Sequence, residues 1–328
     1  MSQRVLVTGG AGFLGVGLVE RLLDEGRRVV VLDDYSRGTQ EHLAHLSDRS
    51  NLVVVEGDVC NPNDLDTCFA AHDGVELIHH LAAVNGTKWF HEDATRVIDV
   101  NINGTLQVIG KAKSWGARLV LASSPEAFGD VEAMPLTSNN HSAFPSASQH
   151  QRFSYGASKY LDEIAVQHAV REGLDARIVR PFNGYGHRMV SDAYGQVVGM
   201  MFQAVQNQEL IEVHGDGNQT RCFTHLDDLV DGFFLAGELH VGCNGASMSG
   251  LAFNLGSTEE ISMLELAHAV NESVGSQAVD IVLSGGYPGD ARRRIPDCTT
   301  ASEVLGWHCR ITLQEGLRRM WSNLQPSP

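Results

Sequence analysis

A tyrosine and a lysine stand four residues apart in the segment Tyr155-Gly156-Ala157-Ser158-Lys159. In a helix this spacing places both side chains on one face. An ammonium beside a phenol favours the phenolate, which lowers the pKa of the phenol from near 10 toward a value useful for a general base. Ser124 follows the apolar run Leu119–Ser123 and is placed to bond the same substrate hydroxyl. These residues predict a site that removes a proton from a hydroxyl group.

A glycine-rich loop near the amino terminus predicts a place for a dinucleotide. The segment Thr8–Gly15 reads TGGAGFLG, follows an apolar run and opens an amphipathic stretch. Glycines in such a loop allow a tight turn and close backbone approach to a pyrophosphate, while the helix N-terminus supplies partial positive charge. The predicted contacts are Gly9, Gly12, Phe13, Leu14 and Gly15.

An acidic residue at the end of the next apolar run indicates which dinucleotide binds. The Asp33 carboxylate, in VVVLDDY, is expected to accept hydrogen bonds from the ribose hydroxyls and to repel a ribose phosphate. NAD is therefore favoured over NADP, although the nearby Arg37, also a predicted cofactor contact, is a residue type that suits a phosphate. Asp58 and Val59 are predicted adenine contacts, while Asp58 taken alone also suits a cap.

These residues lie at the ends of segments that alternate between strand and helix patterns. The predicted strands are Arg4–Thr8, Val29–Leu32, Leu52–Glu56, Leu77–Leu81, Leu119–Ser123 and Ala176–Arg180. The predicted helices between them are Leu14–Asp24, Asn63–Ala71, Ala94–Ser114 and Tyr155–Arg171. The alternation predicts an α/β fold with a Rossmann-like, doubly wound parallel sheet and a smaller α/β substrate-binding lobe.

The length of 328 residues suggests about two domains. We expect residues 1–180 to form the NAD-binding Rossmann domain, and residues 181–328 to form mainly the substrate-binding lobe, with some segments returning to the sheet. The second half contains predicted helices at Gly195–Asn207, Leu226–Glu238 and Met263–Val274, and predicted strands at Leu210–His214 and Ala252–Leu255. The adjacent His79 and His80 point to opposite faces of a strand, so we expect one core and one surface imidazole.

The charge of the chain limits its partners. With 24 Lys and Arg against 40 Asp and Glu, the net charge is −16, which repels nucleic acid and anionic membranes. No stretch approaches the roughly 20 apolar residues that span a bilayer, and the start lacks a signal-peptide pattern, so a cytoplasmic location is expected. The six cysteines form no C-x-x-C pair, so neither a disulfide framework nor a metal site is expected. An anionic ligand must be bound locally, by backbone N–H groups and a few arginines.

The glycine loop, the strand-end serine and the Tyr-x-x-x-Lys pattern together resemble the short-chain dehydrogenase/reductase superfamily. Further motifs resemble its extended branch of nucleotide-sugar epimerases, dehydratases and decarboxylases: HLAA at residues 80–83, Asn101, RPFNGYG at 180–186, GDGNQTR at 215–221, FNLG at 253–256 and VLGW at 304–307. The resemblance implies that bound NAD takes hydride from carbon 4 of a sugar while the Tyr155 phenolate takes the hydroxyl proton. Lys159 and Ser124 would support that base.

The resemblance also implies the remaining ligand contacts. Additional cofactor contacts would be Leu81, Ala82, Asn101, Tyr155 and Lys159. A nucleotide-diphosphate sugar, with UDP favoured, would contact Asn85, Asn183, Arg188, Arg221, Arg292 and Arg294. Within the cluster 292–294 we expect one or two guanidinium groups at the diphosphate and the rest in solvent. The helices that begin near Ala94 and Tyr155 would pair with their copies as a four-helix bundle in a homodimer.

Glu126 distinguishes between the reactions of this family. Dehydratases and decarboxylases that resemble the chain have a glutamate here, where carbon-4 epimerases usually have a small or hydroxylic residue. The neighbouring Pro125 replaces the aspartate that dTDP-glucose-type dehydratases use as an acid. Stretches at 110–130, 185–198 and 293–297 resemble UDP-glucuronate decarboxylases. Decarboxylation, with Glu126 acting near carbon 5, is the leading hypothesis. Carbon-4 epimerisation, 4,6-dehydration, a Glu126 that only caps a turn, and a non-catalytic NAD-binding regulator are the alternatives.

Overall fold

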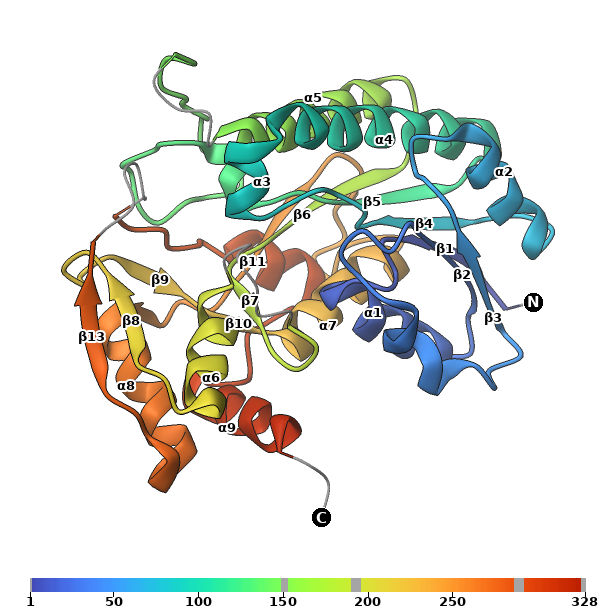
Figure 1. The fold of residues 1–328 in the computed structure, drawn as a ribbon. Helices are drawn as coiled ribbons and strands as arrows, with labels where there is room; N and C mark the ends of the chain where they lie inside the picture. Colours follow the sequence, from blue (N-terminus) through green and yellow to red (C-terminus); the bar gives the residue numbers. More distant parts are fainter. Residues whose placement is uncertain (1, 149–152, 190–195, 286–291, 326–328) are drawn as a thin grey trace.

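The computed structural model describes residues 2–148, 153–189, 196–285 and 292–325, and its centre is a seven-stranded parallel sheet (Figure 1). The strand order is β11-β6-β5-β4-β1-β2-β3. The strands are β1 (Arg4–Thr8), β2 (Arg28–Asp33), β3 (Leu52–Glu56), β4 (Leu77–His80), β5 (Arg118–Ala122), β6 (Ala176–Pro181) and β11 (Ala252–Leu255). Strands β1 to β6 lie in the order 3-2-1-4-5-6, which is that of a doubly wound Rossmann sheet and confirms the predicted fold class.

Helices cover both faces of the sheet, because its central strands are apolar on both sides. One face packs against α2 (Pro62–Ala71), α4 (Ala94–Trp115) and α5 (Ser154–Arg171). The other face packs against α1 (Phe13–Asp24) and α7 (Leu226–Glu238). Figure 1 shows α4 and α5 running side by side over the sheet, with α1 and α7 below it.

Strand β4 carries the two adjacent histidines in the middle of this sheet. His79 and His80 are 0% and 1% exposed, so the prediction of one surface imidazole was wrong. The alternation of faces was right, but α7 covers one face and α4 with α5 covers the other. In the parallel register, His80 lies beside Thr8 at the end of β1.

The second half of the chain forms a smaller lobe with its own apolar core. It contains α6 (Val197–Asn207), α8 (Met263–Val274) and α9 (Leu313–Leu324). Its strand pairs are β8 (Ile211–His214) with β13 (Ile281–Ser284), β9 (Thr220–Cys222) with β12 (Glu260–Ser262), and β7 (Gly184–Tyr185) with β10 (Thr224–His225). Two elements of this half belong to the main domain instead: β11 is the edge strand of the central sheet, and α7 packs on one face of that sheet. The predicted first residue of α6, Gly195, lies outside the described residues.

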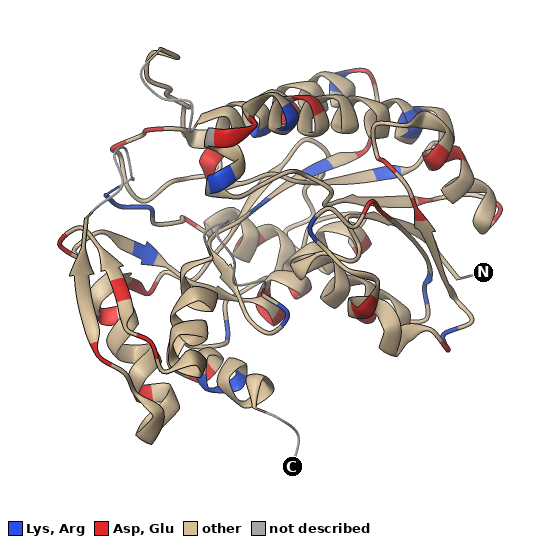
Figure 2. Cartoon of the chain, viewed as in Figure 1, with Lys and Arg blue, Asp and Glu red and all other residues tan. Residues whose placement is uncertain are grey.

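The connections that leave β1 and β4 run to opposite sides of the sheet. Such a switch point opens a crevice beyond the carboxyl ends of the strands, where ligands of α/β proteins bind. Figure 2 shows acidic residues spread over the helices and outer loops of both parts of the molecule. Within the described ranges, no helix has the length and apolar character needed to cross a bilayer.

Candidate active site

A cavity of about 1470 Å³ lies at the switch point, between the carboxyl edge of the sheet and the smaller lobe. Most of the predicted site residues line it, although they come from distant parts of the chain. They are Gly9, Gly12, Phe13, Leu14, Gly15, Asp33, Arg37, Asp58, Val59, Leu81, Ala82, Asn85, Ser124, Glu126, Tyr155, Lys159, Asn183 and Arg221. Asn101, Arg188, Arg292 and Arg294 are not among the described residues of its lining.

The glycine loop forms one wall of the cavity and fits a dinucleotide phosphate. Gly9 has a φ of +70°, and a Cβ there would lie 2.7 Å from the Ala82 backbone nitrogen. Helix α1 starts directly after Gly12, with no side-chain cap and no acidic residue in its first turn. The positive end of the helix is therefore available to an anion in the cavity.

Asp33 is held in place beside this loop. Its Oδ2 accepts a hydrogen bond from the Ala11 N–H at 2.8 Å, and its Oδ1 accepts one from the Tyr35 N–H at 2.9 Å. Burial raises the pKa of the carboxyl, whereas these two backbone bonds lower it. Asp58 both lines the cavity and accepts from the Cys60 N–H at 2.8 Å, so it also closes a turn. The loop and Asp33 together fit NAD.

Ser124 and Glu126 are presented by a short 3-10 turn, η2 (Pro125–Phe128), at the end of β5. The Ser124 hydroxyl caps this turn by accepting from the Glu126 N–H at 3.2 Å. A Cβ at Gly156 would lie 2.5 Å from the Glu126 carbonyl oxygen. The glycine that follows Tyr155 therefore lets α5 begin against the turn, which brings the tyrosine to the serine and glutamate.

Tyr155 is half-buried beside the groups that were predicted to activate it. The Lys159 ammonium and the Ser124 hydroxyl lower the pKa of the phenol, but burial raises it more, so the pKa lies above its usual value. The expected net lowering was wrong because the sequence pattern did not reveal the burial. Phe90 stacks on the Tyr155 ring, with ring centroids 5.2 Å apart.

Asn101 supports the site from behind. Its side chain accepts from the Val84 N–H at 2.8 Å, and donates to the Val84 carbonyl at 3.2 Å and to the Ser158 hydroxyl at 3.0 Å. Ser158 lies on α5 between the tyrosine and the lysine. Asn101 therefore fixes the loop after β4 to the helix that carries Tyr155, although it does not line the cavity.

The predicted substrate arginines are not gathered at one point. Arg294 is 5% exposed, forms an ion pair with Glu126 and donates to the Gly129 carbonyl at 3.3 Å. Arg221 lines the cavity from β9. Arg188 donates to the Glu20 carboxylate on α1 at 3.1 Å. Arg292 is exposed, and the neighbouring Arg293 pairs with Glu260 at 2.8 Å.

Several lining residues were missed by the sequence analysis. The smaller lobe contributes Gln196, Met200, Met201, Leu210, Ile211, Glu212 and His214. No local pattern marks these residues, because only the packing of the two lobes brings them to the cavity. Asp162, which contacts Lys159 at 3.3 Å, was also missed. Its place three residues beyond the lysine, on one helix face, was a readable signal.

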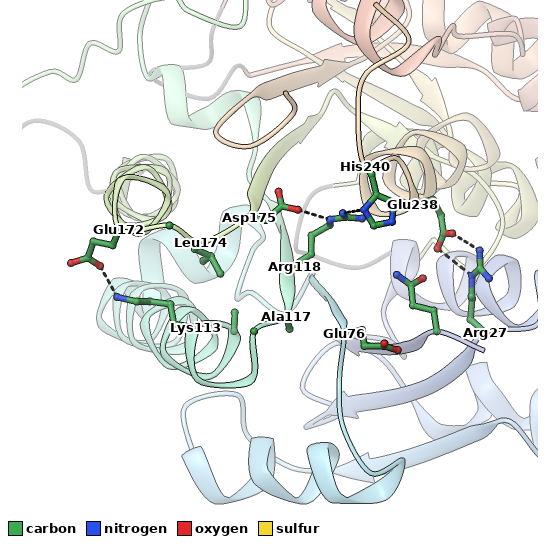
Figure 3. Close-up of a pocket in the computed structure, with 14 residues that line it drawn as sticks. Arg27, Glu76, Lys113, Ala117, Arg118, Glu172, Leu174, Asp175, Glu238 and His240 are labelled. Carbon is green, nitrogen blue, oxygen red and sulfur yellow. Dashed lines mark hydrogen bonds and ion pairs between the residues drawn. The ribbon is translucent and has the colours of Figure 1, made fainter. Parts of the chain in front are cut away.

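A second pocket, of about 730 Å³, lies at the opposite, amino edge of the sheet (Figure 3). Several of its charged groups bind one another. Arg27 pairs with Glu238, Lys113 pairs with Glu172 at 2.6 Å, and Arg118 pairs with Asp175 at 2.9 Å. The larger cavity, where side chains of several chemical types converge, is therefore the candidate active site.

Residues 5–254 match the model of the NAD dependent epimerase/dehydratase family. The chain belongs to this family. It is therefore an NAD-dependent enzyme of the group that the motifs resembled, which confirms the predicted cofactor and the resemblance.

Relatives and solved structures cover almost the whole chain of this family member. UDP-glucuronic acid decarboxylase 1 of Arabidopsis thaliana is 34% identical over 98% of the chain and 70% of the relative. The Xenopus tropicalis protein of the same name is 31% identical over 97% of the chain and 71% of the relative. A structure of UDP-glucose 4-epimerase with UDP-glucose from Thermotoga maritima superposes with a TM-score of 0.86 and 29% identity, over 98% of each chain.

Proposed function

We propose that this family member decarboxylates UDP-glucuronate. The observation that carries the proposal is Glu126, which lies beside Tyr155 and Ser124 in the cavity and forms an ion pair with the buried Arg294. Glu126 lines the cavity, and the bonds of Arg294 to Glu126 and to the Gly129 carbonyl hold the glutamate in place, which suits a reaction that needs an acid–base group beside the oxidised carbon. The relatives named UDP-glucuronic acid decarboxylase support the same reaction.

The proposed reaction begins with oxidation at carbon 4 of the sugar. Bound NAD, held by the glycine loop and Asp33, supplies the hydride acceptor. Tyr155, as the phenolate, takes the proton of the carbon-4 hydroxyl, and the Ser124 hydroxyl bonds the same oxygen. The Lys159 ammonium stabilises the phenolate. The ketone at carbon 4 then activates the bond between carbon 5 and its carboxylate, which leaves as carbon dioxide. The electron pair of the broken bond passes to the ketone as an enolate, and Glu126, held by Arg294, is placed to deliver a proton to carbon 5, which leaves a 4-keto-pentose. Return of the hydride to carbon 4 would give the UDP-pentose.

Few cationic groups are available for the two anionic ligands. We propose that the N-terminus of α1 binds the NAD diphosphate, and that Arg221 with Asn183 and Asn85 binds the sugar nucleotide. All of these line the cavity. Because the net charge is −16, the field of the whole chain opposes both ligands. The loss of Arg221 should therefore weaken binding of the sugar nucleotide strongly.

Carbon-4 epimerisation is the second candidate, favoured by the likeness to the Thermotoga maritima UDP-glucose 4-epimerase. Return of hydride to the other face of the ketone would give the epimer without any step at carbon 5. A 4,6-dehydratase is less favoured, because Pro125 stands where an acid would be needed.

The test is incubation of the purified protein with UDP-glucuronate. We expect the products to be carbon dioxide and a UDP-pentose or UDP-4-keto-pentose. Trapping of the gas detects the first product, and mass spectrometry of the nucleotide identifies the second. UDP-glucose, which has no carboxylate, is the control and should release no gas. An isomeric UDP-hexuronate without gas would show epimerisation instead and would exclude decarboxylation.

The role of Glu126 is tested by Glu126→Gln. We expect oxidation at carbon 4 to continue, so that NADH absorbance accumulates, while the later step and product formation slow. Glu132→Gln, at an exposed position of the same region, is the matched control and should behave like the natural protein. An unchanged product rate in Glu126→Gln would mean that Glu126 does not act at carbon 5.

We also propose that α4 and α5 pair with their copies in a homodimer. Their outer surface carries apolar side chains that are 45–49% exposed: Ile98, Leu106, Leu161 and Ile164. Burial of such a surface in a four-helix bundle is favourable. Leu106→Glu should convert a particle of about twice 35.6 kDa into a monomer in light scattering. Leu283→Glu, at a 56% exposed leucine on β13, should not.

A further inference from the structure

Lys159 is buried together with a carboxylate to which the proposed reaction assigns no role. Lys159 and Asp162 are 2% and 1% exposed, and the Nζ donates to Oδ2 at 3.3 Å. Both lie on one face of α5, three residues apart. Transfer of an ammonium from water into such a place is costly unless an opposite charge accompanies it. Asp162 is in position to supply that charge.

The other nearby carboxylate on α5, that of Glu163, binds a different cation. Glu163 accepts from the Arg180 Nε at 2.7 Å and from its Nη2 at 2.6 Å, and it also bonds the Ser123 hydroxyl. These bonds tie Glu163 to β6 and to the end of β5. Among the described ion pairs, the one formed by Lys159 is with Asp162. Asp162 is therefore the counter-charge of the lysine.

A buried chain of hydrogen bonds runs from the cofactor loop toward Asp162. The Ala82 N–H donates to the Thr8 hydroxyl at 3.3 Å, which lies 2.7 Å from His80 Nδ1. The Nε2 of His80 lies 3.1 Å from the Thr105 hydroxyl on α4. Burial lowers the pKa of His80 to about 3, so the ring is neutral and carries one N–H. If the Thr8 hydroxyl donates to Nδ1, then Nε2–H donates to Thr105.

The remaining proton of Thr105 can then face Asp162. Burial raises the pKa of the Asp162 carboxyl to about 6, although Lys159 and, to a smaller extent, the Thr105 hydroxyl lower it; the Glu163 charge adds to the rise. Asp162 is accordingly ionised at neutral pH. The charged or titratable groups around it are Lys159, Glu163, Tyr155 and the neutral His80.

We propose that Asp162 is a positioning residue that holds the Lys159 ammonium in place beside Tyr155. This rests on the proposed role of Tyr155 as the base. Two charges then act on the phenol in opposite directions, because Lys159 lowers the pKa of Tyr155 and Asp162 raises it. The effect of Lys159 is the larger of the two. Removal of Asp162, by releasing the Lys159 ammonium from its place beside the phenol, should therefore raise the pKa of Tyr155.

The test is titration of the Tyr155 phenol in the full-length protein saturated with NAD. The tyrosinate absorbance is recorded against pH for the natural protein and for Tyr155→Phe, and the difference isolates Tyr155. The same pair of measurements is then made in the Asp162→Asn background. We expect the phenol to titrate at higher pH in that background. An unchanged or lower value would overturn the proposal.

The direction of the shift separates positioning from a merely structural role. A loosened α5 would hydrate the phenol and reduce the effect of burial, so its pKa would fall. In a Lys159→Met background, Asp162→Asn should lower the pKa of Tyr155, because only the direct repulsion is then removed. A further rise in that background would also overturn the proposal.

Two further variants serve as an alternative and as a control for Asp162→Asn. Asp162→Ala removes the same charge with a residue that favours helix, and should give the same upward shift if Asp162→Asn folds poorly. Asp228→Asn removes another buried carboxylate, one that accepts from the Arg310 and Ile311 N–H groups, and should leave the Tyr155 titration unchanged. No substrate is used, so a failed UDP-glucuronate assay would not decide this test.

Discussion

The two edges of the central sheet contain similar charged residues and use them differently. At the carboxyl edge, Tyr155, Lys159 and Glu126 line one large cavity. At the amino edge, Arg118 donates to the Asp175 carboxylate at 2.9 Å (Figure 3). It also donates to the carbonyl of Gly237 at 2.6 Å. The bonds of Arg118 at the amino edge therefore join the end of α7 to the sheet.

The difference shows that the surroundings of a residue, and not its type, decide whether it does chemistry. The histidines of β4 are adjacent in sequence and equally buried. His80 contacts the Thr8 and Thr105 hydroxyls, whereas His79 lies among Arg118, Arg177 and the end of α7. Substitutions at the carboxyl edge should therefore change turnover, and those at the amino edge should change stability.

The largest expected effect is that of Tyr155→Phe. Loss of the base should lower turnover of UDP-glucuronate at least about a hundredfold, the usual scale for general base catalysis. Folding should persist, because the phenyl ring can keep its stacking on Phe90. Turnover and thermal unfolding are measured on the same preparation. Turnover that survived the substitution would show that another group is the base.

The converse experiment is Arg118→Met at the amino edge. The substitution leaves the Gly237 carbonyl at the end of α7 without its charged donor, at a cost of about 1.5–3 kcal/mol. Turnover per folded molecule should not change. Urea unfolding measures the first quantity and the substrate assay measures the second. A matching fall in turnover would mean that the two edges are coupled.

Lys113→Met is the control for that variant. Lys113 lines the same pocket, but its ion pair with Glu172 is exposed, at 42% and 46% of the two side chains. Exposed pairs contribute roughly 0–1 kcal/mol. A loss as large as that of Arg118→Met would show that burial is not the reason for the difference.

Much of this arrangement was predictable from the sequence. The main strands were located because buried parallel strands are nearly continuous runs of Val, Ile and Leu. Local signals also located Gly9, Asp33, Ser124 and Tyr155, because each follows or ends a strand, or begins a helix. Parallel strands bring such positions to one edge of the sheet, so the candidate site follows from the topology.

Other features depend on packing that no local pattern records. The sequence did not show that His80 is covered on both sides, or that burial would raise the pKa of Tyr155. The arginine cluster was located and its division was expected, but the sequence did not show that Arg294 is the buried member or that it pairs with Glu126. These outcomes are set by the other lobe and by helices distant in sequence.

The smallest expected effect concerns His79 and acid stability. Burial, with Arg118 and Arg177 nearby, lowers the pKa of His79 from 6.5 to about 3. The folded protein therefore holds a neutral ring that the unfolded chain protonates below pH 6.5, so stability present above that pH is lost as pH falls toward about 3. Between about pH 7 and pH 5.5 the loss should be roughly 1 kcal/mol.

His79→Leu should remove this part of the acid sensitivity. Within the described part of the chain, neither ring nitrogen of His79 has a hydrogen-bond partner, so the substitution breaks no such bond. The difference in melting temperature between variant and natural protein should grow in favour of the variant as the pH is lowered. His141→Gln, at an exposed histidine, should show no such trend. A difference that is constant with pH would mean that His79 is not the group that titrates. The acid sensitivity would then come from another residue, and His80, on the opposite face of β4, would be the next residue to replace.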